Sequence, residues 1–223
     1  NIGIKISGSN LNDVTISDNT FNNTGFVETQ TNSFHNTAIT VQMPITTARL
    51  STNVEIIGNS ITDYRIGIHG SNIQRMNIIP NATSNLPNEI IFNLGATPSI
   101  AEDHIGIWLQ NCPGAIINGS YDPGATSPVA NIKNNQIANG TDKFKGIDIG
   151  KSVNCRINCN FIENIPISMR FNESCIGTIL RQNNMTEYDV AIQIDNAEIG
   201  TQKQVNTSNQ DEPANNYWFD VSG

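Results

Sequence analysis

The chain has 223 residues, a net charge of −8, and a composition that is 37% apolar but only 6% aromatic. Its negative charge creates no positive field for phosphate backbones, so we expect no nucleic-acid partner. No apolar run approaches the roughly 20 residues of a membrane-spanning helix, so we expect no membrane insertion. Ile and Asn are abundant whereas the usual helix formers are scarce, which favours strands over helices.

A four-residue phrase recurs along the chain: a small residue, Ile, any residue, and usually a second aliphatic residue. Its seven copies begin at Gly3, Ala38, Gly67, Gly106, Gly146, Pro166 and Ala191. Apolar residues at every second position lie on one face of a strand, so the phrase predicts strands that bury one face. The chain enters the first of these strands at Ile2. Because the open end of a stack of strands needs a cap, we expect more protein to precede it.

A second phrase, Asn followed two positions later by an apolar residue, comes after most copies of the first. It begins at Asn19, Asn59, Asn135, Asn160 and Asn183. Late in the chain the first phrase repeats after about 20 and then about 25 residues, but earlier the spacing is close to 40, which leaves room for an extra turn or a long loop. Three short strands per repeat, stacked on their neighbours to complete one core, predict a β-solenoid with parallel sheets.

The recurrent Asn has a physical explanation at the corners of such a solenoid. Asn tolerates the left-handed backbone conformation, and its amide can bond the Asn of the next turn. We therefore expect Asn19, Asn59, Asn135, Asn160 and Asn183 to form a stacked ladder that fixes the register. The alternative is that Asn merely marks surface loops.

With these two phrases the sequence resembles the right-handed parallel β-helix proteins of the pectate-lyase-like superfamily. The resemblance extends from the first residues to Ile194 and implies an all-β, right-handed parallel β-helix with three short strands per turn. We expect helical turns over residues 1–198 and an irregular tail over 199–223 that leads out of the helix. The tail is similar to segments of large surface proteins that Bacteroidota export through the type IX secretion system.

The four cysteines, Cys112, Cys155, Cys159 and Cys175, include no CxxC pair. Cys155 and Cys159 as metal ligands would need two more ligands, and no His lies near them in sequence. We expect structural cysteines, either buried thiols or disulfide-bonded, and no metal site.

The resemblance also implies what an enzyme of this fold would need. Polysaccharide lyases of the superfamily hold Ca²⁺ with acidic residues and use Arg or Lys as the base, and its glycosidases use clustered Asp carboxylates. Neither pattern is intact here, and a Ca²⁺ cofactor is expected only if the chain is lyase-like. The catalytic candidates by residue type and proximity are Asp63, Tyr64, Arg65 and His69. The alternative is an ordinary corner whose Tyr and charges face solvent.

Outward positions within the first phrase predict a mixed polar strip on one sheet. Its expected members are Lys5, Thr40, His69, Trp108, Asp148, Ser168 and Gln193. Trp108 could stack on a sugar face while polar groups bond sugar hydroxyls, so Trp108, Asp148, His69 and Gln193 are the candidate ligand-binding residues. The alternative is a plain solvated sheet face.

We therefore expect a β-helical segment of a large secreted or cell-surface protein, serving as a non-catalytic spacer, an adhesin-like element or a glycan-contacting surface. Its expected partners are extracellular polysaccharide or the secretion machinery. One alternative is a polysaccharide lyase, hydrolase or epimerase that acts on an acidic glycan. A second is a trimeric phage tailspike or fibre protein.

Overall fold

The computed structural model is an all-β structure in which short strands form three parallel sheets. It describes residues 2–9, 11–23, 36–45, 53–93, 103–122, 124, 126, 129–135, 143–200, 202–205 and 211–219. Among these residues there is no helix, and so none long and apolar enough to cross a membrane.

Each sheet takes one strand from each successive coil. Sheet A contains β1 (Ile2–Ser7), β4 (Thr37–Gln42), β7 (Ile66–Ser71), β10 (His104–Gln110), β13 (Phe144–Gly150), β16 (Ile167–Ser174) and β19 (Val190–Glu198). Sheet B contains β2 (Val14–Ser17), β5 (Val54–Ile57), β8 (Met76–Ile79), β11 (Ile116–Asn118), β14 (Arg156–Asn158) and β17 (Ile179–Arg181). Sheet C contains β3 (Thr20–Asn22), β6 (Ser60–Thr62), β9 (Glu89–Phe92), β12 (Ile132–Asn134), β15 (Phe161–Glu163), β18 (Asn184–Thr186) and β22 (Tyr217–Phe219).

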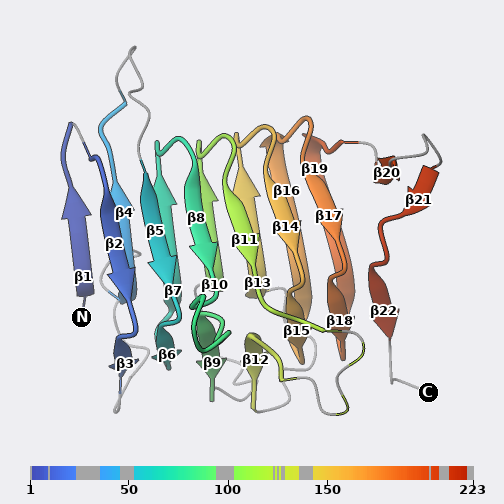
Figure 1. The fold of residues 1–223 in the computed structure, drawn as a ribbon, viewed down its shortest axis with the longest axis horizontal. Helices are drawn as coiled ribbons and strands as arrows, with labels where there is room; N and C mark the ends of the chain where they lie inside the picture. The colour runs from blue at the N-terminus through green and yellow to red at the C-terminus, as the bar shows by residue number, and fades with distance from the viewer. Residues whose placement is uncertain are drawn as a thin grey trace.

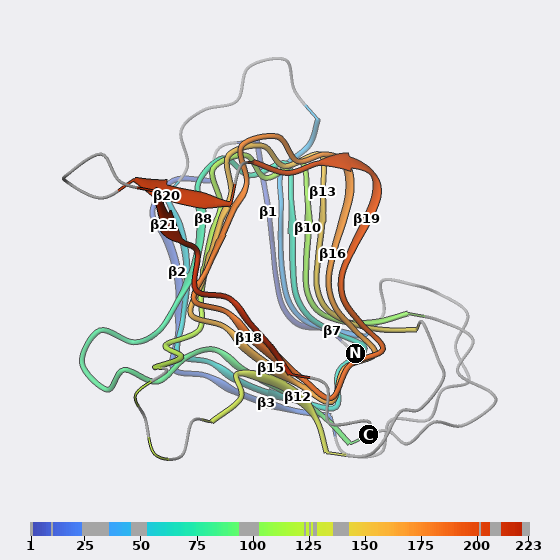
Figure 2. The same ribbon diagram turned by 90° about the vertical axis from the view of Figure 1, so that its right-hand side faces the viewer.

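The chain visits sheets A, B and C in turn and then steps to the next coil, which makes a right-handed parallel β-helix. The coils follow one another along the long axis in sequence order (Figure 1), and the view along that axis shows the three sheets around one interior (Figure 2). The expected fold class is confirmed. The wide spacings in the sequence do not correspond to an extra coil, because consecutive phrases lie on neighbouring strands of sheet A.

Inward aliphatic side chains stack in rows that form one continuous core. One row runs through Ile39, Ile68, Ile107, Ile147 and Met169, all of them buried. Each such side chain contributes about 1.5–3 kcal/mol when it leaves water. No single coil can bury its own row, so the coils stabilise one another.

The small residue of the first phrase lies where sheet C turns into sheet A and the backbones come close. A Cβ added to Gly106 would lie 2.6 Å from the carbonyl oxygen of Gly146 in the next coil and 2.9 Å from the Ile132 side chain. Space at this corner therefore restricts the position to small side chains.

One copy of the phrase has a different register from the one that the sequence suggested. Met169 pairs with Ile147 and Arg170 with Asp148, so Ser168 stands level with Gly146 and the sixth copy begins at Ser168 rather than at Pro166. A phrase that begins at Pro166 and one that begins at Ser168 both place a small residue before an apolar one. Only the pairing of β13 with β16 distinguishes the two.

An asparagine row runs along the corner between sheets B and C. Side-chain amides bond from coil to coil, at 3.0 Å from Asn19 to Asn59, 2.9 Å from Asn59 to Asn88, 3.0 Å from Asn160 to Asn183 and 3.0 Å from Asn183 to Asn216. Each Nδ2 donates to the Oδ1 of the following coil. The left-handed backbone conformation belongs to the residue before the asparagine, for example Asp18, Cys159 and Gln182, and not to the asparagine itself.

Asn135 lies outside this row, contrary to the sequence prediction. It is at the corner between sheets C and A, where its Nδ2 donates to Oδ1 of Asn93 at 2.9 Å. In its coil Ala130 occupies the row position, because Ile132 pairs with both Ile90 and Ile162. Asn131, one residue later, donates to Oδ1 of Asn160 at 3.1 Å.

The segment 199–223 is not simply an irregular tail, because part of it continues the helix. Gly200 N–H donates to Thr178 O at 3.0 Å, and β22 pairs with β18 in sheet C. An antiparallel pair, β20 (Lys203–Val205) and β21 (Asp211–Pro213), lies between these two points. The boundary predicted at residue 198 therefore falls inside a seventh coil.

None of the four cysteines, all of which lie in the described part, is disulfide-bonded. Cys112, Cys155 and Cys175 are buried, and Cys159 is partly exposed. Burial raises the pKa of Cys155 to about 11, so this thiol is a small apolar core group rather than a nucleophile.

Candidate functional site on the outer face of sheet A

Seven outward side chains form a continuous row across sheet A, which we call the central row. Strand pairing places one residue of each coil in it, in the order Lys5, Thr40, His69, Trp108, Asp148, Arg170 and Gln193. Six of these seven were predicted from the sequence. The seventh is Arg170, which takes the place expected for Ser168 because of the shifted register in β16.

Trp108 is at the middle of the central row and stacks on His69 of the preceding coil. The two ring centroids are 4.6 Å apart with an interplanar angle of 29°. Burial lowers the pKa of His69 to about 4, so the imidazole is neutral at pH 7. Trp108, which is partly exposed, therefore presents an aromatic surface, and the buried, uncharged His69 ring packs against it.

Two hollows lie beside Trp108, and both are lined by Trp108 and Gln110. One has a volume of about 440 Å³, and its remaining lining residues are Lys5, Thr40, Gln42, His69 and Ser71. Hydroxyl, amide and imidazole groups thus surround the aromatic ring on this side. The arrangement offers one flat apolar surface with hydrogen-bonding groups at its edge.

The second hollow, of about 230 Å³, is strongly charged. Asp148 lines it, is buried, and accepts a hydrogen bond at Oδ1 from Asn172 Nδ2 at 2.7 Å. Burial raises the pKa of Asp148, while the nearby Arg170 and Lys145 act in the opposite direction. Arg170 bridges two carboxylates, with NH1 3.5 Å from Asp148 Oδ2 and Nε 2.9 Å from Asp195 Oδ2.

A second ion pair borders the charged hollow. Lys145 Nζ lies 2.8 Å from Asp103 Oδ2, and the lysine side chain is almost completely buried. Arg65 Nε donates to the carbonyl oxygen of Asp103 at 3.0 Å. Three cationic side chains thus lie close to three carboxylates, those of Asp103, Asp148 and Asp195, and charges of both signs lie at this end of the face.

The four residues proposed as catalytic candidates do not form one group. Asp63 accepts hydrogen bonds from the backbone and side chain of Asn93 at the corner between sheets C and A, with a shortest distance of 2.8 Å. Tyr64 is buried in the core, edge-on to Phe21. Arg65 and His69 line different hollows. The structure brings only these last two to the outer face.

Gln193 lies in the last coil of the row. Its Nε2 donates to Asp195 Oδ1 at 3.1 Å, while its Oε1 is buried and has no hydrogen-bond partner among the described residues. An incoming hydroxyl or amide donor would satisfy that oxygen.

Within the part of the chain that the structure describes, no three His, Cys, Asp or Glu side chains are arranged to hold a metal ion. Comparison of the chain with models of known protein families, with characterised proteins and with solved structures finds no match.

Proposed function

We propose that this β-helix is a non-catalytic segment of a secreted or cell-surface protein and that the outer face of its sheet A contacts a glycan. One observation carries the proposal: Trp108 and Gln110 separate two hollows whose other linings are largely polar. A sugar ring has an apolar face and a rim of hydroxyl groups. An aromatic platform bordered by amides, hydroxyls and charges complements both features.

The rigidity of the scaffold supports this role. Each coil adds one strand to sheet A at a repeat of about 4.8 Å, so the side chains of the central row are regularly spaced. Because they lie on strands, no loop has to become ordered when a ligand binds. A glycan running along the helix axis would meet a new set of polar groups at every coil. Binding to such a preformed surface costs little conformational entropy on the protein side.

Binding to immobilised polysaccharides tests the proposal. We expect the folded chain to be retained by at least one polysaccharide and to release neither reducing ends nor unsaturated sugars from it. Retention by no member of a panel that spans acidic and neutral glycans would contradict the proposal.

A polysaccharide-modifying enzyme is the second candidate, and the raised pKa of Asp148 is the observation that favours it. A buried carboxyl with a raised pKa beside cations is typical of general acids in glycan chemistry, although structural ion pairs shift pKa values too. Turnover in the same panel, lost in Asp148→Asn but kept in Asp63→Asn, would establish this candidate in place of the first.

A further inference from the structure

The corner between sheets B and C is tight in most coils but carries a loop in two consecutive ones. Two residues connect the strands in four coils, namely 18–19, 58–59, 159–160 and 182–183. Residues 80–88 instead connect β8 to β9, and residues 119–131 connect β11 to β12. Because these two coils are neighbours, the loops lie together on the outside of the helix, away from the outer face of sheet A.

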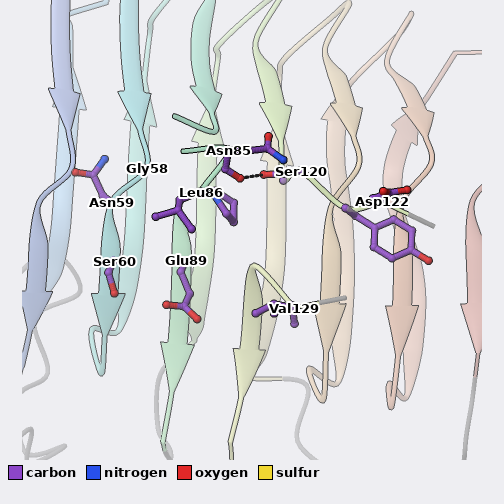
Figure 3. A pocket seen from close by; sticks show the side chains of 13 residues that line it. Gly58, Asn59, Ser60, Asn85, Leu86, Glu89, Ser120, Asp122 and Val129 are labelled. Atoms are coloured by element: carbon purple, nitrogen blue, oxygen red, sulfur yellow. Dashed lines mark hydrogen bonds between the residues drawn. The ribbon is translucent and has the colours of Figure 1, made fainter. Parts of the chain in front are cut away.

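The two loops and the corner of the preceding coil enclose a pocket of about 360 Å³ (Figure 3). Its lining includes Gly58 and Ser60 at that corner, Leu86 from the first loop, and Tyr121 and Val129 from the second. This volume is within the range of small-molecule sites. Ala130, where the asparagine row lacks its amide, is also part of the lining.

Hydrogen bonds fix both loops in place. Ser120 Oγ donates to Asn85 O at 3.1 Å, which joins one loop to the other (Figure 3). Asn81 Nδ2 donates to Asp18 Oδ1 at 2.8 Å, across the corner of the intervening coil at Gly58, and Tyr121 N–H donates to Cys159 O of the next coil at 2.6 Å. Each loop is therefore also tied to another coil. Asn85 and Ser120 both have positive φ values, of 54° and 63°; Asn adopts this conformation readily, whereas Ser adopts it less often.

The pocket leaves apolar side chains in contact with water. The exposed fractions of Leu86 and Val129 are 61% and 68%, which are among the highest for large apolar side chains in the described part of the chain. Figure 3 shows them on different sides of the pocket. A ligand with an apolar body would cover both.

The charged side chains that line the pocket are all acidic. Glu89 and Asp122 line it, and no Lys, Arg or His does so among the described residues. Lys133 lies behind Glu89, with Nζ 3.9 Å from Oε1, a weak contact between partly exposed groups. An anion would be repelled here, and a cation would meet two carboxylates.

We propose that this pocket binds a small organic cation that carries an ammonium group on an aliphatic body. The aliphatic part contacts Leu86 and Val129, and the ammonium group lies against Glu89 or Asp122. The site is at the corner between sheets B and C, away from the proposed glycan surface on sheet A, and does not depend on that surface.

Three six-carbon probes whose head groups are cationic, neutral and anionic test the proposal: hexylammonium, hexanol and hexanoate, titrated at pH 7 into ¹⁵N-labelled protein. We expect hexylammonium to shift the amide signals of Ser120, Asp122 and Glu89 and to bind about five-fold more tightly than hexanol, with hexanoate the weakest. Equal affinities for all three probes, or shifts confined to other residues, would overturn the proposal.

Variants separate the apolar contribution from the charge contribution. Leu86→Ser should weaken hexylammonium binding, whereas Ile176→Ser, at a 54% exposed apolar side chain between β16 and β17, should leave it unchanged. Glu89→Gln combined with Asp122→Asn should abolish the preference over hexanol, and Lys133→Gln should increase it. Retained preference in the Glu89→Gln and Asp122→Asn double variant, or equal loss in the two Ser variants, would contradict the assigned contacts.

Discussion

Asn160 and Asn183 are fully buried and joined by two hydrogen bonds, since the side-chain and backbone N–H groups of Asn160 both donate to Oδ1 of Asn183, at 3.0 and 3.1 Å. Asn183 in turn donates to Ile157 O at 2.8 Å and to Asn216 Oδ1 at 3.0 Å. One amide therefore ties three coils together. A shift of any of these coils by one residue would leave buried polar groups without partners.

Truncation of the asparagine row should cost most in its interior. We expect Asn183→Ala to lower the free energy of unfolding by about 2–3 kcal/mol, because it removes the acceptor of the buried backbone N–H of Asn160. Asn19→Ala, in the first coil and partly exposed, should cost less than about 1 kcal/mol. Urea unfolding of both variants measures the difference, and equal losses would show that the row does not set the stability.

The buried carboxylate of Asp148 should be destabilising when its partner Arg170 is removed. Arg170→Gln removes a cation that acts against the raised pKa of Asp148, so it should destabilise the protein by about 1–3 kcal/mol at pH 7. Asp148→Asn should cost little, because the amide carries no charge to desolvate. The double variant should be close to Asp148→Asn alone, and additive losses in thermal unfolding would contradict this coupling.

Two buried histidines should make the protein less stable in acid. Burial lowers the pKa of His69 and of His104 to about 4, below the value near 6.5 that each regains on unfolding. The unfolded state therefore binds more protons between these values, so this stability is complete above pH 6.5 and is lost as the pH falls towards 4. The loss is about 3 kcal/mol per histidine at most.

A substitution at His104 tests this acid sensitivity. His104 stacks on Phe144 with ring centroids 4.9 Å apart, so Phe should fit in its place without a titrating group. The decrease in unfolding free energy from pH 7 to pH 4.5 should be smaller in His104→Phe than in the parent. An unchanged decrease would assign the acid sensitivity to other groups.

The architecture could be predicted from the sequence because the aliphatic residues of the recurrent phrase are the residues that form the core. Rows such as Ile68, Ile107 and Ile147 need neighbouring coils for burial, so their recurrence indicates stacked coils. The asparagine row also contains two members that the sequence analysis did not predict. Asn88, followed by Glu89 and Ile90, carries the second phrase, and Asn216 carries it with Trp218 as the apolar residue.

Register and loops could not be predicted in the same way. Two overlapping phrases compete at 166–171, and only the pairing of β13 with β16 places Arg170 beside Asp148. The pocket between β8–β9 and β11–β12 depends on two loops meeting across coils, and no local pattern records which loops become neighbours. The charged hollow was missed for the same reason, since its lining residues Arg65, Asp148 and Arg170 come from different coils.

Calorimetric titration of a glycan selected from the polysaccharide panel tests the central claim most directly, with Trp108→Ala compared against Tyr217→Ala, an exposed aromatic on sheet C. We predict that Trp108→Ala weakens binding about ten-fold or more, because the stacking surface between the two hollows is lost, and that Tyr217→Ala leaves it unchanged. Unaltered affinity in Trp108→Ala would contradict a glycan contact on the outer face of sheet A.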